Sequence, residues 1–315
     1  MLAALLLIAS SAHAAVFDLD RLSNQDFLRL LQQASAPAPI PAPAPKSGLV
    51  FEKDGSLIST DELAERLQAA RVVYVGEQHD QASHHGVQLE ILRALHTRKP
   101  GLVDGMEMVS LDLQQGLDDY LSGRTADSDF EKFWKKSWGY PFDLYRPILQ
   151  FCRAQSIAIK GLNAPIGVVR QIAKGGLSSL TPEQRGWLPS QVAQTADARY
   201  MAFLEKSLEG HGPMPPDQKA RMLEAMAAWN ETMVDSIAKL AAESPVLVIA
   251  GSGHMVYDKG APESAARRSA AAQSVVLPYP LDGEARPLAE LLNDLRDPKT
   301  GDAELADHFR LLPSD

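Results

Sequence analysis

The chain has 315 residues, 45% of them hydrophobic, which is enough for one large domain or two small ones with a sizeable core. Its formal net charge of -9 and its pI near 5.4 argue against a nucleic-acid surface and against a general affinity for anionic membranes. These values exclude a chain that is disordered throughout and fit an acidic periplasmic or extracellular protein.

The chain opens with an apolar run of about ten residues that ends in Ala12-His13-Ala14, the A-x-A form of a signal-peptidase site. We therefore expect residues 1–14 to be a signal peptide and the protein to be periplasmic and soluble once it is cleaved. The run is too short to span a bilayer, and no later segment reaches roughly 18 apolar residues. The residue directly after the expected cleavage site is Ala15 rather than a cysteine, so the sequence does not predict a lipoprotein.

Three segments are expected after the cleavage site. Residues 15–35 read as a helical arm, and residues 36–47, which alternate Ala and Pro, read as a stiff extended linker. Residues 48–315 form the main body. The body opens with Asp54-Gly55, a strong hairpin turn, and then Ser59 and Glu62 make a capping box for a helix that runs to Ala70.

The rest of the body alternates strands and helices, which is the signature of a parallel sheet with crossover connections. A long helical stretch at about 164–243 interrupts this alternation and reads as a cap. We therefore predict an α/β fold with a central, mostly parallel sheet flanked by helices and a helical cap insertion. The expected strands are 72–76, 102–107, 157–162, 245–250 and 274–279, with a helix at 84–97 after the first of them.

Cys152 is the only cysteine, so an exported chain has no internal disulfide and must be held by its core. It lies in an amphipathic pattern, where a small buried apolar residue is the expected role.

Acidic and histidine side chains follow three of the predicted strands. The first strand leads into Glu77 and His79, the second ends at Glu107, and the fourth opens into a glycine-flanked turn that presents His254. Because parallel strands end at one edge of a sheet, these four side chains are expected to share a cleft. Carboxylate and imidazole groups suit Zn²⁺ or Mn²⁺ and can also act as general acid and base.

His84 and His85 are weaker candidates for the same site. They stand at the start of the predicted helix 84–97, where one of the two is expected to face solvent.

Six blocks of this sequence, spread in order over roughly residues 48–280, resemble the ChaN-type haem-binding uptake proteins. These proteins belong to a superfamily that also includes the Tiki and TraB proteins and the erythromycin esterases. The resemblance implies a central polar site built from Glu77, His79, Glu107 and His254. The blocks are YVGEQHD followed by HH, GMEM, WGYPFDLYRPIL, GLNAP, AWNETMVDSI and AGSGHMVYDKGAPE.

The resemblance also implies ferric haem held by a tyrosine oxygen at the cap or at a dimer interface, with haem-uptake machinery as a further partner. A phenolate suits ferric iron and loses affinity when the iron is reduced. Tyr145 is the first expectation because it lies in a matched block, and Tyr200, Tyr140 and Tyr257 follow in that order. An imidazole ligand would point to His211 instead.

Three functions of different classes remain open at this point. The first is haem binding for uptake or storage. The second is a metal-dependent hydrolase or protease that uses the Glu/His site as its metal and catalytic centre. The third is a partner-binding scaffold in which that site survives only structurally. We expect the protein not to be an enzyme. A Soret band on adding haemin separates the first function from the others.

Overall fold

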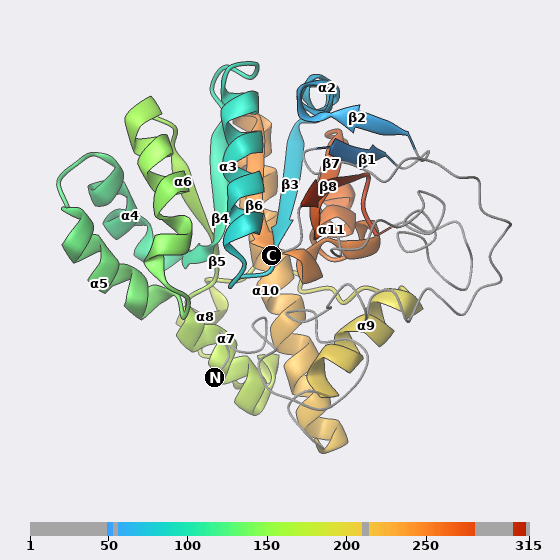
Figure 1. Cartoon of the computed structure of the whole chain (residues 1–315). Coiled ribbons are helices and arrows are strands. Elements are labelled where there is room, and N and C mark those ends of the chain that lie inside the picture. The colour runs from blue at the N-terminus through green and yellow to red at the C-terminus, as the bar shows by residue number, and fades with distance from the viewer. Residues whose placement is uncertain (1–48, 53–55, 210–213, 281–304, 313–315) are drawn as a thin grey trace, which may run out of the picture.

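The computed structural model describes residues 49–52, 56–209, 214–280 and 305–312, which contain one sheet of eight strands (Figure 1). The sheet order is β2-β1-β8-β7-β3-β6-β4-β5. From β8 to β5 all neighbouring strands run parallel, whereas β1 is antiparallel to β2 and β8. The expected mostly parallel sheet is confirmed. The strands are β1 (Leu49–Glu52), β2 (Leu57–Ser59), β3 (Val72–Glu77), β4 (Val103–Ser110), β5 (Ile159–Asn163), β6 (Val246–Gly251), β7 (Gln273–Pro280) and β8 (His308–Leu312).

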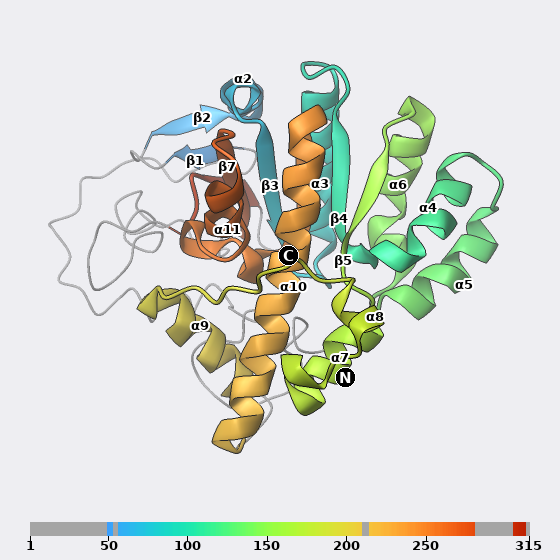
Figure 2. The same cartoon turned by 180° about the vertical axis from the view of Figure 1, so that it is seen from behind.

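Helices cover both faces of this sheet. In Figure 1, α3 and α6 lie in front of the strands, and Figure 2 shows α10 and α11 on the opposite face. The helices are α2 (Thr60–Arg66), α3 (Ala82–His96), α4 (Gln114–Leu121), α5 (Asp127–Ser137), α6 (Phe142–Gln155), α7 (Ile166–Gly175), α8 (Pro182–Arg185), α9 (Ala198–Glu209), α10 (Pro216–Glu243) and α11 (Ala261–Arg268). Short 3-10 turns are η2 (Leu67–Ala69), η3 (Leu111–Leu113), η4 (Leu177–Ser179), η5 (Ser252–His254) and η6 (Val256–Asp258).

The helical insertion lies between β5 and β6, as the sequence predicts. In both views α7, α9 and the first half of α10 lie beyond the lower ends of the strands, which are their C-terminal ends (Figures 1 and 2). The cap therefore stands over the edge of the sheet where Glu77, Glu107 and His254 are found.

Local sequence explains the central elements. All six residues of β3 are buried, because helices cover both faces of the strand, and its run of Val and Tyr suits that position. The capping box is also confirmed, since the Ser59 side chain accepts a hydrogen bond from the Glu62 backbone N–H and Glu62 bonds back to Ser59.

Some boundaries differ from the prediction. β4 continues to Ser110, so Glu107 lies within the strand rather than at its end. However, the pairing of β4 with β6 stops at Met106, which leaves Glu107 directly past the last paired residue. β8 was not expected from the sequence. It is a short strand that is stabilised by pairing with β7 on one side and β1 on the other.

The expected signal peptide, arm, Ala/Pro linker and Asp54-Gly55 turn, together with His211, lie outside the described residues. β1 and β2 do pair as an antiparallel hairpin on either side of that turn. None of the helices in the described ranges is long and apolar enough to cross a membrane.

Candidate functional site

The end of β3 carries the first half of the polar site. Glu77 is the last residue of the strand, stands opposite Gly251 of β6 and exposes 2% of its surface. His79 follows two residues later, and its Nδ1 lies 2.6 Å from Glu77 Oε1. The two side chains therefore face each other at the end of the strand.

Four donors surround the Glu77 carboxylate. His79 Nδ1 and the Tyr145 hydroxyl, at 2.5 Å, lie on Oε1, and Gln88 Nε2 at 2.7 Å and His85 Nδ1 at 3.2 Å lie on Oε2. Burial would raise the pKa of Glu77, but the His85 charge and the hydrogen bonds from both histidines hold it well below its usual range. A carboxylate has about four lone-pair positions, so Glu77 is saturated by its own neighbours.

His85 is the positive partner of Glu77. Both of its ring nitrogens face acceptors, because Nδ1 is near Glu77 Oε2 and Gln88 Oε1 and Nε2 lies 3.2 Å from the His79 carbonyl oxygen. Burial opposes the charge, yet Glu77 and these acceptors raise the pKa of His85 above its ordinary value. The doubly protonated imidazolium fits this setting, since it alone donates from both nitrogens.

The prediction that His84 or His85 faces solvent is wrong, because both are buried. The first turn of α3 packs inward, where the ring of His85 lies 4.3 Å from that of Tyr145 on α6. His84 Nδ1 accepts the backbone N–H of Gln78, and burial together with the charge of His85 lowers the pKa of His84 to about 4.

Glu107 and His254 form the second half of the site. Glu107 Oε2 accepts the backbone N–H of Gly251 at 2.7 Å, and its Oε1 lies 3.2 Å from His254 Nε2. These last two atoms are close enough for an ion pair, but neither makes a well-directed hydrogen bond within the described structure. Burial opposes ionisation, but His254 nevertheless lowers the pKa of Glu107. The other ring nitrogen, Nδ1, lies 2.5 Å from Asn230 Oδ1.

The two halves meet at Gly251. A Cβ at this position would lie 2.9 Å from His79 Cε1 and 3.6 Å from Glu107 Oε2, so only glycine allows both side chains to approach the strand end. The structure thus brings Glu77, His79, Glu107 and His254 together. All four are buried, and none exposes more than 2% of its surface.

The geometry does not support a divalent metal at this cluster. Within the ranges that the structure describes, no group of three or more His, Cys, Asp or Glu side chains could hold one metal ion. The physical reason is that Glu77 and Glu107 are each turned toward a histidine and backbone or side-chain donors rather than toward a common centre.

The four candidate tyrosines fall into two classes. Tyr145 and Tyr200 are buried, and their hydroxyls donate to Glu77 Oε1 and to the Gly253 carbonyl. Burial raises the pKa of both phenols, and Glu77 raises that of Tyr145 further. Tyr140 and Tyr257 are only half-buried.

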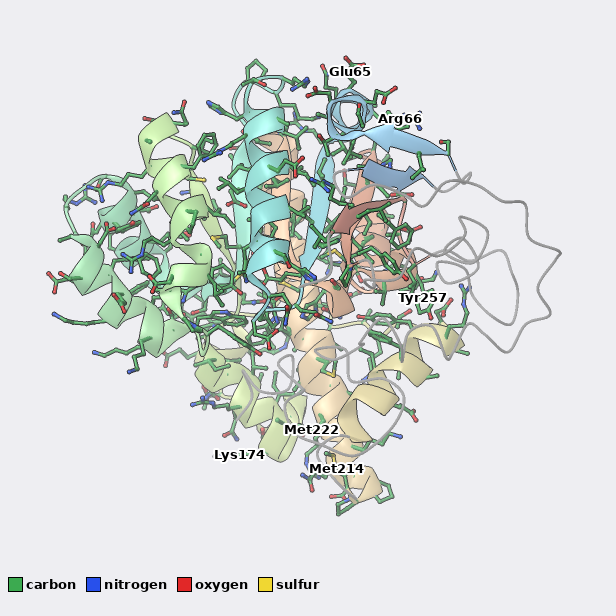
Figure 3. All side chains as sticks on the ribbon, in the orientation of Figure 1. Glu65, Arg66, Lys174, Met214, Met222 and Tyr257 are labelled. Carbon is green, nitrogen blue, oxygen red and sulfur yellow. The ribbon has the colours of Figure 1, made fainter. Side chains whose placement is uncertain are left out.

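Tyr257 lies between the end of the sheet and α9 (Figure 3). Its φ of 62° is left-handed, an uncommon conformation for a bulky residue. Its ring is 6.5 Å from that of Phe203, and the Arg199 guanidinium carbon is 5.5 Å from the ring centroid. Tyr140 instead packs on His79, with 5.3 Å between the rings.

Sequence reasoning missed three side chains that support the cluster. Gln88 donates to Glu77, Trp138 Nε1 donates to the Tyr145 hydroxyl, and Asn230 orients His254. A signal existed for Asn230, since it is polar within a stretch of α10 that is otherwise rich in Ala and Met. Gln88 follows His85 by one helical turn, which also places the two on one face.

Comparison with known proteins agrees with this architecture. A family model described as haem-binding uptake, Tiki superfamily, ChaN matches residues 63–264. The structure of ChaN from Campylobacter jejuni, described as cofacial haem binding, superposes with a TM-score of 0.60 at 17% identity and covers 85% of this chain and 98% of that one. An erythromycin esterase superposes with a TM-score of 0.48 at 12% identity, covering 81% of this chain and 93% of that one.

A curated plant protein also matches part of the chain. Protein RETICULATA-RELATED 5, a chloroplastic protein of Arabidopsis thaliana, is 24% identical over 209 residues, which is 61% of this chain. The match spans only 28% of that relative's own length.

Proposed function

Since this chain belongs to the ChaN family of haem-binding uptake proteins in the Tiki superfamily, we propose that it binds ferric haem for haem or iron uptake. The observation that carries the proposal is the family match over residues 63–264, which includes β3 to β6 and the helices between them. The fold shared with ChaN of Campylobacter jejuni, whose description names cofacial haem binding, supports it.

Tyr257 is our proposed ligand of the iron. It is half-buried, it follows the polar strand end, and its strained backbone is typical of a residue held in place for function. The Arg199 guanidinium lies over the Tyr257 ring, and Lys259 follows two residues later. Both cations pair with Asp197, and both lie where the propionates of a haem bound at Tyr257 would need a positive partner. Bound haem would supply a ferric centre that a phenolate suits.

The first expectation, Tyr145, is less suited to this role. Its hydroxyl is inside the core and is already donated to Glu77, and its raised pKa disfavours the phenolate that iron requires. Tyr200 is less suited for the same reason, because its hydroxyl already donates to the Gly253 carbonyl and accepts from Asn230.

We further propose that haem binding joins two copies of the chain. A single tyrosine leaves one face of the haem plane without a protein ligand, and a second copy can cover that face with its own haem or side chains. This element of the proposal rests on the resemblance to the family.

Haemin titration of the full chain tests the ligand. We expect a Soret band with the high-spin spectrum of a single oxygen ligand in the parent, and its loss or at least tenfold weaker binding in Tyr257→Phe. Tyr145→Phe is the matched control, because it also removes one hydroxyl, and it should keep the spectrum.

If Tyr145→Phe loses the Soret band and Tyr257→Phe keeps it, Tyr145 is the ligand of the iron. A parent chain that binds no haemin at micromolar concentration would contradict the proposed function as a whole. Sedimentation with and without haemin tests the dimer, which is contradicted if the mass stays that of one chain.

A further inference from the structure

A groove lies between α2 and α3, at the edge of the sheet where β3 begins. Leu63 and Leu67 line one side, Gly86 and Leu89 line the other, and Arg310 of β8 also contributes. Figure 3 marks α2 by Glu65 and Arg66 at the top of the molecule, whereas the strand ends with the polar cluster lie lower. The groove holds about 430 Å³, within the range of roughly 300–1,000 Å³ that small-molecule sites occupy.

The groove is lined by apolar side chains, by three arginines (Arg93, Arg98 and Arg310) and by two acids (Asp61 and Glu90), so its side chains carry a net positive charge. Arg98 contacts Asp61 at 3.9 Å, but the Asp61 side chain is 91% exposed, so water screens this pair. Arg310 donates to Glu90 Oε2 at 2.8 Å and to its neighbour's carbonyl, while its buried Nε has no hydrogen-bond partner in the described ranges. A buried donor without an acceptor costs free energy that an anionic oxygen would recover.

We propose that this groove binds a small amphipathic anion, with an apolar body over Leu89 and Ala94 and a carboxylate or sulfonate head at Arg310 and Arg98. The volume fits a single-chain or aromatic molecule and is small for a partner protein. No residue of the groove belongs to the proposed haem site, so each proposal can be tested without the other.

Gly86 offers a direct way to block the groove. It is an exposed residue of α3, and a Cβ built on it meets nothing within 4 Å. Gly86→Leu therefore fills space without a clash and improves helix propensity. Gly167 of α7 is a matched control, since it is also an exposed helical glycine with nothing within 4 Å of a Cβ.

The experiment titrates the full chain with the fluorescent anion 8-anilinonaphthalene-1-sulfonate. We expect Gly86→Leu to weaken binding at least tenfold and Gly167→Leu to leave it unchanged. Equal affinity in both variants overturns the proposal, because the dye then binds elsewhere. Circular dichroism checks that both variants are folded.

The anionic head is tested by competition. Decanoate should displace the dye, and decanol should not. Arg310→Gln should lower the affinity for decanoate about tenfold, as expected for the loss of one charge-assisted hydrogen bond. Equal displacement by decanol, or an Arg310→Gln variant with the parent's affinity, contradicts an anion site. A parent chain that sediments as a dimer through this face, and dissociates in Gly86→Leu, would assign the groove to a second copy instead.

Discussion

At the scale of single residues, two buried carboxyl groups on β3 and β4, the strands on either side of β6, end in opposite protonation states because only one of them has hydrogen-bond donors around it. Glu77 of β3 is ionised because four donors surround it. Asp104 of β4 is also fully buried, but its Oδ1 has no hydrogen-bond partner in the described structure and its Oδ2 contacts only the Cys152 thiol at 4.0 Å. Burial raises the pKa of Asp104 to about 8, so this side chain is a neutral acid at pH 7.

Asp104→Asn should therefore stabilise the protein at alkaline pH. In the unfolded chain Asp104 loses its proton near its ordinary pKa, whereas the folded chain keeps it until about pH 8. The stability of the parent relative to the variant thus falls as pH rises through this window and levels off above it. Urea denaturation of both proteins at pH 5 and pH 8.5 measures the difference.

Asp217→Asn serves as the control for that measurement. Asp217 is exposed, and its hydrogen bond with Arg221 lowers its pKa. Asp217→Asn should therefore not increase the free energy of unfolding at pH 8.5. A parent and an Asp104→Asn variant whose difference in free energy is the same at both pH values would show that Asp104 is ionised in the fold.

At the scale of elements, α10 contacts both the polar cluster and α11. Successive residues of a helix point about 100° apart, so Asn230 and Glu231 can serve different neighbours. Asn230 faces His254, whereas Glu231, which is 2% exposed, accepts hydrogen bonds from Ser264, Arg267 and Arg268 of α11. One helix thereby orients His254 and binds α11 alongside itself.

Glu231→Ala should destabilise the protein by about 3 kcal/mol, since it removes a buried carboxylate and leaves two arginines without their partner. Chemical denaturation of the purified chain measures the loss. Asp235→Ala, which breaks the exposed pair with Lys239 one turn further along α10, should change stability by less than about 0.5 kcal/mol. Similar effects of the two substitutions would mean that Glu231 contributes no more than a surface charge.

At the scale of the whole molecule, the cap and the sheet edge enclose the polar cluster, so a ligand as large as haem has to bind outside it. Trp138 and Tyr140 pack on His79, with ring separations of 5.1 Å and 5.3 Å, and shield it. This separates a buried, self-paired Glu/His cluster from the half-buried Tyr257 beside α9. Within the cluster, the Glu107 carboxylate of β4 accepts the backbone N–H of Gly251 at the end of β6.

Haem should stabilise the whole fold through mass action. A ligand that binds only the folded state adds about 2.7 kcal/mol at a hundredfold excess over its Kd. We expect thermal unfolding of the full chain to shift upward with haemin, and to depend on protein concentration only when haemin is present, because the proposed dimer requires it. A shift of the same size in Tyr257→Phe would indicate non-specific haemin binding.

The sequence by itself determined the features that depend on neighbouring residues. The apolar run of β3, the Ser59 capping box and the alternation of strands and helices are local patterns, and the fold class follows from them. The approach of Glu77 and Glu107 was also predictable, because parallel strands end at the same edge of a sheet.

Only the tertiary structure decided how those side chains are used. The Tyr145 hydroxyl reaches Glu77 across 68 residues of sequence, and Asn230 reaches His254 across 24. Such partners depend on how α6 and α10 pack, which no local pattern encodes. For the same reason the sequence could not show that the cluster is closed and buried, that both His84 and His85 face inward, or that β8 completes the sheet. Burial and partner choice are properties of packing, and packing brings together residues far apart in the chain.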